Sequence, residues 1–200
     1  MRTFHFTPPT EAYAAVLFDC DGTLVDSMEL HWEGWQHALR TSGAPYTFTR
    51  ALYQELAGVD THRTVEILNE RHAAWVDPGT VVRLKREFFL ERQQAVREIE
   101  PVASWARALH AQGVPLAVVS GGATRVVRRS LEFTGLLPLF REVITFEDVQ
   151  NGKPAPDMFL LAAQRLGVQP ADCLVVEDGE PGMIGARAAG MAVAVVTEQA

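Results

Sequence analysis

The sequence predicts an α/β protein with a parallel sheet covered by helices on both faces and an all-helical insertion after the first core strand. From Glu100 onward, short apolar segments alternate with helical patterns, which is typical of a parallel sheet. Residues 28–96 show helical spacing of apolar residues and no segment typical of a strand. The expected domains are a core of residues 1–27 and 97–200 and a helical domain of residues 28–96.

Four helices are expected in the insertion, each with a recognisable start or stop signal. Gly43 ends the first helix and Gly58 the second, Asp60 is a candidate N-cap of the third, and Asp77 with Pro78 begins the fourth. These helices are expected over residues 28–40, 51–57, 61–73 and 78–96.

The core is expected to contain five strands, each an apolar run, separated by helices that end near glycines such as Gly113, Gly167 and Gly190. The expected strands are residues 14–18, 115–119, 143–146, 173–176 and 192–196. The expected helices are residues 101–113, 125–133, 157–166 and 181–189. Nearly continuous apolar strands favour a sheet that is buried on both faces.

The composition is typical of a globular protein and argues against two classes of partner. The chain has 200 residues, of which 48% are hydrophobic and 22% charged, and a formal net charge of −7. Such a chain has no general electrostatic attraction for nucleic acid or an anionic membrane. No apolar stretch approaches the roughly 20 residues of a membrane helix. We expect no nucleic-acid or membrane partner, and a monomer or weak dimer.

The two cysteines, Cys20 and Cys173, are too few for a disulfide framework and lie in or beside expected core strands. Residues 1–9 lack the apolar centre of a signal peptide and are expected to be a loose leader before the first strand. Both observations favour a reducing, cytoplasmic location.

Asp19 and Asp21 stand at the end of the first expected strand, with Gly22 directly after them. Residues two apart in an extended chain share one side, so both carboxylates can face one small site. Their repulsion favours a divalent cation, and a set of oxygen ligands favours Mg²⁺. The two acids could instead be solvated turn residues. A calcium loop is excluded because Leu30 occupies the position where such a loop carries a glutamate.

Polar residues also follow the other expected strands. Ligands bind beyond the carboxyl ends of the strands in an open parallel sheet, so these groups are expected to converge. Their chemistry matches a metal ion, held by the acids, and a phosphate, held by the ammonium, hydroxyl and backbone N–H groups. The residues concerned are Asp19, Asp21, Ser120, Gly121, Lys153, Glu177 and Asp178.

The motifs together resemble those of haloacid dehalogenase superfamily hydrolases, in the β-phosphoglucomutase-like branch that carries a helical cap. Within that branch the chain is similar to sugar-phosphate phosphatases of the fructose-1-phosphate/6-phosphogluconate type. The matching stretches occur in the family's order over nearly the whole chain. They are residues 19–27 (DCDGTLVDS), 118–121 (VVSG), 152–159 (GKPAPDMF) and 176–178 (VED), with Gly182 and residues 188–191 (AAGM).

This resemblance implies a role for each matching residue. Asp19 is the expected nucleophile, which forms an aspartyl-phosphate, and Asp21 is the expected general acid and base. The expected phosphate-binding residues are Thr23, Ser120, Gly121 and Lys153. The expected Mg²⁺ site consists of Asp19, Asp178, Glu177 and the backbone carbonyl of Asp21.

The resemblance also implies that the cap recognises the far end of the substrate, for which His31, Arg63 and Lys85 are the candidates. The expected function is a Mg²⁺-dependent phosphatase for a small phosphorylated metabolite, most of all a sugar phosphate. A β-phosphoglucomutase-like isomerase is the first alternative. Residues 121–123 lack the basic residue with which mutases grip a second phosphate, and Thr61 replaces a mutase arginine. A non-enzymatic phospho-aspartate switch is the second alternative.

Overall fold

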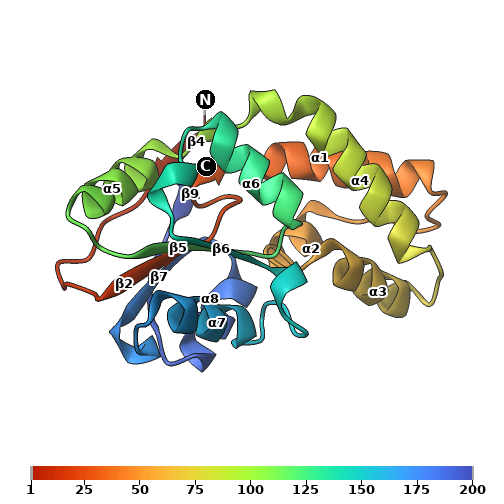
Figure 1. Ribbon diagram of the computed structural model, residues 1–200. Helices are drawn as coiled ribbons and strands as arrows, with labels where there is room; N and C mark the ends of the chain where they lie inside the picture. The colour runs from red at the N-terminus through yellow and green to blue at the C-terminus, as the bar shows by residue number, and fades with distance from the viewer. Residues whose placement is uncertain (1, 200) are drawn as a thin grey trace.

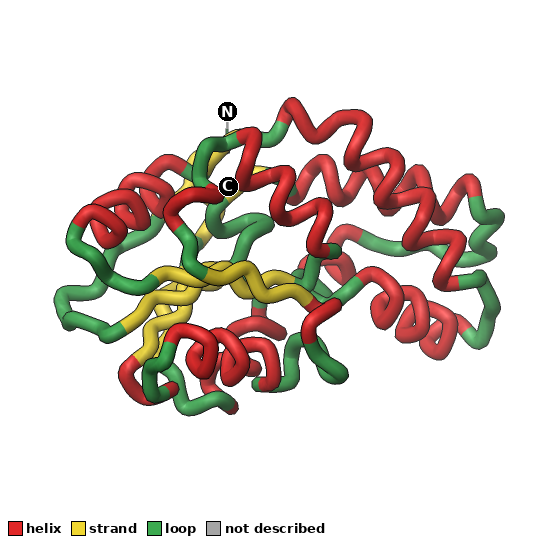
Figure 2. Tube along the Cα trace, in the orientation of Figure 1, coloured by secondary structure: helices red, strands yellow, loops and turns green. Residues whose placement is uncertain are grey.

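A computed structural model describes residues 2–199 and contains a parallel five-stranded sheet with the order β6–β5–β2–β7–β8. All five strands were predicted, with boundaries that differ by at most one residue. The strands are β2 (Ala15–Phe18), β5 (Leu116–Ser120), β6 (Glu142–Thr145), β7 (Cys173–Glu177) and β8 (Ala192–Val195). The predicted fold class is confirmed, and Figures 1 and 2 show the sheet between two layers of helices.

The two faces of the sheet carry different helices because neighbouring residues of a strand point to opposite sides. Val16 and Phe18 of β2 pack with α5 (Glu100–Ala111) and α6 (Thr124–Phe133), whereas Ala15 and Leu17 pack with α7 (Asp157–Leu166) and α8 (Glu180–Ala188). Figure 1 shows α5 and α6 above the sheet and α7 and α8 below it. Short 3₁₀ helices complete the connections: η1 (Gln93–Ala95), η2 (Leu137–Leu139), η3 (Phe146–Asp148) and η4 (Pro170–Asp172).

The inserted segment forms the four expected helices, which are α1 (Met28–Thr41), α2 (Arg50–Glu55), α3 (Thr61–His72) and α4 (Pro78–Arg92). Both predicted N-caps are present: Asp60 accepts a hydrogen bond from the backbone N–H of Arg63, and Asp77 from that of Thr80. The helices share a hydrophobic cluster of their own around Trp35. That separate cluster supports the predicted division into core and cap. The domain bounds themselves stay a prediction.

Two short segments that the sequence did not reveal join the cap to the core. Strand β3 (Val25–Asp26) pairs antiparallel with β4 (Arg97–Glu98), which brings the entry and exit of the cap together. The fourth helix ends at Arg92 instead of continuing to Val96. The buried Gln93 that follows it donates hydrogen bonds of 2.8 Å to the carbonyl of Val126 and the hydroxyl of Ser130, both in α6. The base of the cap is therefore tied to the core.

The N-terminal segment is ordered, so the expectation of a loose leader is wrong. Strand β1 (Thr3–His5) pairs antiparallel with β9 (Thr197–Gln199), and Phe6 is buried with its ring 5.3 Å from that of Trp105. A pairing between opposite ends of the chain leaves no local signal in the sequence. Within residues 2–199, no helix is long and apolar enough to cross a membrane.

Replacing Phe6 by alanine should lower the free energy of unfolding by about 3 kcal/mol, because a buried aromatic ring leaves a cavity in the core. Urea unfolding followed by tryptophan fluorescence measures this change. Thr7→Ala is the matched control, since Thr7 is exposed. Equal stability of the two variants would contradict the packing of the N-terminal segment onto the core.

Candidate active site

The polar residues at the strand ends come together because β2 is paired with both β5 and β7. Asp19 directly follows β2, Ser120 ends β5, and Glu177 ends β7 with Asp178 after it. Carboxylate oxygens of Asp19, Glu177 and Asp178 all lie within 4.8 Å of one another. The predicted convergence at the carboxyl edge of the sheet is therefore present in the geometry.

Lys153 supplies the positive charge at this edge from the loop before α7. Its ammonium group is fully buried and donates hydrogen bonds to Oδ1 of Asp19 at 2.6 Å and to Oε1 of Glu177 at 2.5 Å. Burial alone would lower the pKa of Lys153, but the two carboxylates outweigh it and raise the pKa. Lys153 is therefore charged and holds Asp19 in place.

One ammonium does not balance the acidic groups. Burial, together with the charges of Glu177 and Asp178, raises the pKa of Asp19 well above its usual value in spite of Lys153. Burial and the charge of Glu177 likewise raise the pKa of Asp178 to about 7. Because the ionised forms of Asp19 and Asp178 are disfavoured, an additional positive charge would stabilise the site.

Glu177 and Asp178 are fixed by different partners. Oε2 of Glu177 accepts the backbone N–H groups of Asp178 and Gly179, each at 2.8 Å, while its other oxygen binds Lys153. Oδ1 of Asp178 accepts the hydroxyl of the buried Thr23 at 2.9 Å. Both oxygens of Glu177 are thus engaged within the protein, whereas Oδ2 of Asp19 and Oδ2 of Asp178 accept no hydrogen bond from a side chain of residues 2–199. Thr23 contacts an acid of the cluster instead of facing the cavity described below.

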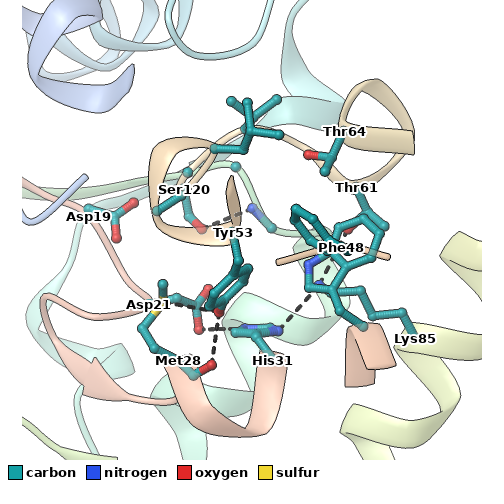
Figure 3. Close-up of a pocket in the computed structure, with 17 residues that line it drawn as sticks. Asp19, Asp21, Met28, His31, Phe48, Tyr53, Thr61, Thr64, Lys85 and Ser120 are labelled. Carbon is teal, nitrogen blue, oxygen red and sulfur yellow. Dashed lines mark hydrogen bonds and ion pairs between the residues drawn. The ribbon is translucent and has the colours of Figure 1, made fainter. Parts of the chain in front are cut away.

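Asp21 belongs to a second chain of contacts that runs into the cap (Figure 3). Its Oδ1 accepts the hydroxyl of Ser27 at 2.6 Å and lies 3.0 Å from Nε2 of His31. Nδ1 of His31 is 3.3 Å from the ammonium of Lys85, which is also 3.4 Å from the hydroxyl of Thr61. The acid at the strand end is therefore linked to helices α1, α3 and α4.

These contacts set the charge state of Asp21. Burial would raise the pKa of Asp21, but His31, Ser27 and Lys85 stabilise its carboxylate and lower the pKa overall. Burial lowers the pKa of His31 and brings that of Lys85 to about 8. Oδ2 of Asp21 has none of these contacts and lies beside Gly122, where a Cβ would be 3.6 Å from it. This oxygen is available to a bound molecule.

The cap covers these groups and encloses a cavity of about 70 Å³. Asp19, Asp21 and Ser120 of the core and Tyr53 and Lys85 of the cap all line it (Figure 3). The cap loop lies so close to the loop after β5 that a Cβ at Gly121 would overlap the carbonyl of Gly58. Glycine at position 121 is therefore required for this closed arrangement.

The structure brings most of the predicted site residues to this cavity but not all of them. His31 and Lys85 line it together with the core residues Asp19, Asp21 and Ser120. Arg63 does not: its side chain is half exposed and forms ion pairs with Glu66 at 2.9 Å and Glu70 at 3.5 Å. Three residues that the sequence gave no role also belong to the site: Tyr53 and Thr61 line the cavity, and Ser27 binds Asp21. Of these, Ser27 is part of the first motif and could have been found from it.

Comparison with known proteins agrees with this geometry. A family model described as haloacid dehalogenase-like hydrolase matches residues 13–190. The chain belongs to this family. The haloacid dehalogenase-like hydrolase is 36% identical over 185 residues to the fructose-1-phosphate phosphatase of Escherichia coli (strain K12), covering 90% of this chain and 95% of the relative. It is 31% identical over 186 residues to hexitol phosphatase A of the same organism, covering 92% and 83%.

The fold of the hydrolase agrees with a solved structure of the same family. A hydrolase from Deinococcus radiodurans R1, solved with bound phosphate and sodium, superposes with a TM-score of 0.65 at 31% identity and covers 90% of this chain and 79% of that one. The predicted resemblance and the predicted enzyme class are confirmed. The chain is a phosphoric monoester hydrolase of the haloacid dehalogenase type.

Gly22→Ala should lower kcat/KM for phosphate ester hydrolysis more than tenfold. Gly22 has φ +93°, and a Cβ there would overlap the carboxylate of Asp178, so Asp178 must move. Gly43→Ala is the control, because Gly43 has φ +72° and open space around it. Steady-state kinetics of both variants separates the effect of backbone strain from the effect of moving the Asp178 carboxylate. Equal activity of the two variants would contradict the role of Gly22.

Proposed function

We propose that the protein is a Mg²⁺-dependent phosphatase that hydrolyses a small phosphorylated metabolite, most of all a sugar phosphate, through an aspartyl-phosphate on Asp19. The observation that carries this proposal is the contact of 2.6 Å between Asp19 and the buried ammonium of Lys153, because Asp19 also lines one covered cavity together with Asp21. The names of two relatives, a fructose-1-phosphate phosphatase and a hexitol phosphatase, support the substrate class. The cytoplasmic location and the monomeric or weakly dimeric state belong to the proposal.

The donor set fits Mg²⁺. Asp19 and Asp178 offer hard carboxylate oxygens, and the raised pKa of each reflects a cluster short of positive charge. Glu177 is occupied by Lys153 and two backbone N–H groups, so we assign it to the positioning of Lys153. When bound, Mg²⁺ would neutralise charge on the transferring phosphate and reduce its repulsion of the nucleophile.

In the first step, a carboxylate oxygen of Asp19 attacks phosphorus and the bond between phosphorus and the leaving oxygen breaks. Lys153 keeps Asp19 oriented and offsets its repulsion of the phosphate. Ser120 and Gly121 line the cavity, where the Ser120 hydroxyl and the backbone N–H of Gly121 can hold the phosphate oxygens, while the N–H of Gly122 donates to Oγ of Ser120 at 3.0 Å. The bound phosphate dianion lies beside Asp21 and opposes the lowering of its pKa by His31, Ser27 and Lys85, which favours the protonated form. This form gives its proton to the leaving alcohol.

In the second step, water attacks phosphorus and the bond from phosphorus to Asp19 breaks, which regenerates the carboxylate and releases phosphate. Asp21 takes the proton from this water through its free Oδ2. Ser27 and His31 hold the other oxygen of Asp21 and fix the orientation of the carboxylate. The cap over the cavity limits the substrate to small molecules, because the bulk of a protein cannot enter beneath it.

The phosphatase is favoured over a mutase by the surroundings of the loop after β5. A mutase must bind a second phosphate, and the nearest cation after Ser120 is Arg125, which is exposed and does not line the cavity. A non-enzymatic switch is disfavoured by the position of Asp21, which would hydrolyse the aspartyl-phosphate that such a switch must keep.

Asp19→Asn should abolish turnover while the fold is kept, since an amide cannot attack phosphorus. Asp21→Asn should lower kcat by about 10²–10⁴-fold, the usual contribution of a general acid and base. Asp26→Asn is the control, because Asp26 lies in the same segment but pairs with Arg2 at 3.5 Å. Phosphate release measures turnover, and circular dichroism measures whether the fold is kept. Activity of Asp19→Asn close to that of the wild type would exclude the covalent mechanism.

Removal of divalent cations with a chelator should abolish activity, and added Mg²⁺ should restore it. Asp178→Asn should raise the Mg²⁺ concentration for half-maximal activity at least tenfold, because one free carboxylate of the cluster is lost. Glu180→Gln removes a nearby exposed charge and should have no such effect. Full activity in the presence of chelator would rule out the metal requirement.

With β-glucose 1-phosphate and a bisphosphate primer, the protein should release phosphate and form little glucose 6-phosphate. A coupled dehydrogenase assay for glucose 6-phosphate and a colorimetric phosphate assay follow the two products in one sample. Efficient isomerisation with little phosphate release would decide for the mutase instead.

A further inference from the structure

A second cavity of about 310 Å³ lies between α4 of the cap and α6 of the core. Figure 1 shows α6 above the sheet and α4 of the cap beside it. The cavity shares four lining residues with the active-site cavity, which are His31, Thr61, Lys85 and Gly122. The two cavities are therefore neighbours that share part of their lining.

The active-site cavity alone is too small for a complete substrate. One water molecule needs about 10–15 Å³ of such space, so about 70 Å³ holds a few waters, comparable to one phosphate group. A sugar attached to that phosphate has to lie elsewhere. The second cavity has the size of small-molecule sites, which start at about 300 Å³.

The walls of the second cavity combine apolar surface with a few polar groups. Val82 and Phe89 of α4 and Val126 of α6 form apolar walls. The charged side chains of Arg86 and Glu147 border it from opposite sides of the interface between cap and core. Among residues 2–199, Arg86 has no ion pair with an acidic group, whereas Glu147 accepts the backbone N–H of Thr124 at 3.2 Å. This pattern suits a ring with an apolar face and a polar edge.

We propose that the alcohol part of the substrate lies in this second cavity, that Val82 limits its size, and that Arg86 binds its polar edge. The inference rests on the proposed phosphatase function and names the specificity residues of that site. The phosphate occupies the cavity above Asp19, and the sugar passes beside His31, Thr61 and Lys85. Arg63 takes no part, because it lies outside both cavities.

The proposal predicts that filling the second cavity affects substrates according to their size. Val82→Trp should lower kcat/KM at least tenfold for the hexose monophosphate that the wild type hydrolyses fastest, mainly by raising KM. Its kcat/KM for acetyl phosphate, whose small acyl group does not reach the cavity, should stay within twofold of the wild type. Arg86→Ala should raise KM for the hexose monophosphate at least threefold and leave acetyl phosphate unchanged.

Glu87→Trp is the matched control on the same helix. The Glu87 side chain is 53% exposed, lines neither cavity, and should leave both substrates within twofold. Val82→Ala enlarges the cavity and should raise kcat/KM for a disaccharide monophosphate relative to a hexose monophosphate. This variant keeps the test independent of any folding defect caused by the larger tryptophan.

Two results would overturn the proposal. One is an unchanged kcat/KM for the hexose monophosphate in Val82→Trp. The other is an equal loss for acetyl phosphate and the hexose monophosphate in Val82→Trp together with no change of size preference in Val82→Ala. Failure of the wild type to hydrolyse either compound would instead contradict the phosphatase function itself, so the two failures are distinguishable.

Discussion

The structure of the site depends on one buried ammonium group. Lys153 lies between Asp19 and Glu177, and without it two carboxylates would face each other in a region shielded from water. Removal of one of the three residues leaves an uncompensated buried charge, so the conformation of each depends on the other two. Lys153 also connects three parts of the chain, because its partners follow β2 and end β7 while it precedes α7.

The cap takes part in the same electrostatic arrangement through Asp21. Ser27 and His31 bind one of its oxygens, and Lys85 lies behind His31, whose ring stacks on Phe89 at 4.2 Å. Asp21, the proposed general acid and base, is thus held partly by the core and partly by the cap. A cap in another position would leave Asp21 with fewer partners, so the arrangement of the acid depends on closure.

The sequence revealed those features that rest on local patterns. The five core strands, the cap helices, the N-caps Asp60 and Asp77 and the acids at the strand ends are all encoded within a few neighbouring residues. Long-range contacts were not visible in this way. The pairing of β1 with β9, the joint formed by β3 and β4, and the cavity between α4 and α6 each require segments that are far apart in the chain. The family resemblance of the cap made Arg63 a candidate for substrate binding, yet Arg63 forms ion pairs with Glu66 and Glu70 of its own helix.

The pairing of β1 with β9 also determines how the molecule would respond to a pulling force applied at its two ends. Thr3 lies opposite Gln199 and His5 opposite Thr197, so the free ends of both strands are at the same end of the ladder. Tension between the ends therefore opens the hydrogen bonds of this pair one after another instead of shearing them together. The five parallel strands would bear the load only after β1 and β9 had separated, with Phe6 and Val196 as the next buried side chains on the two sides.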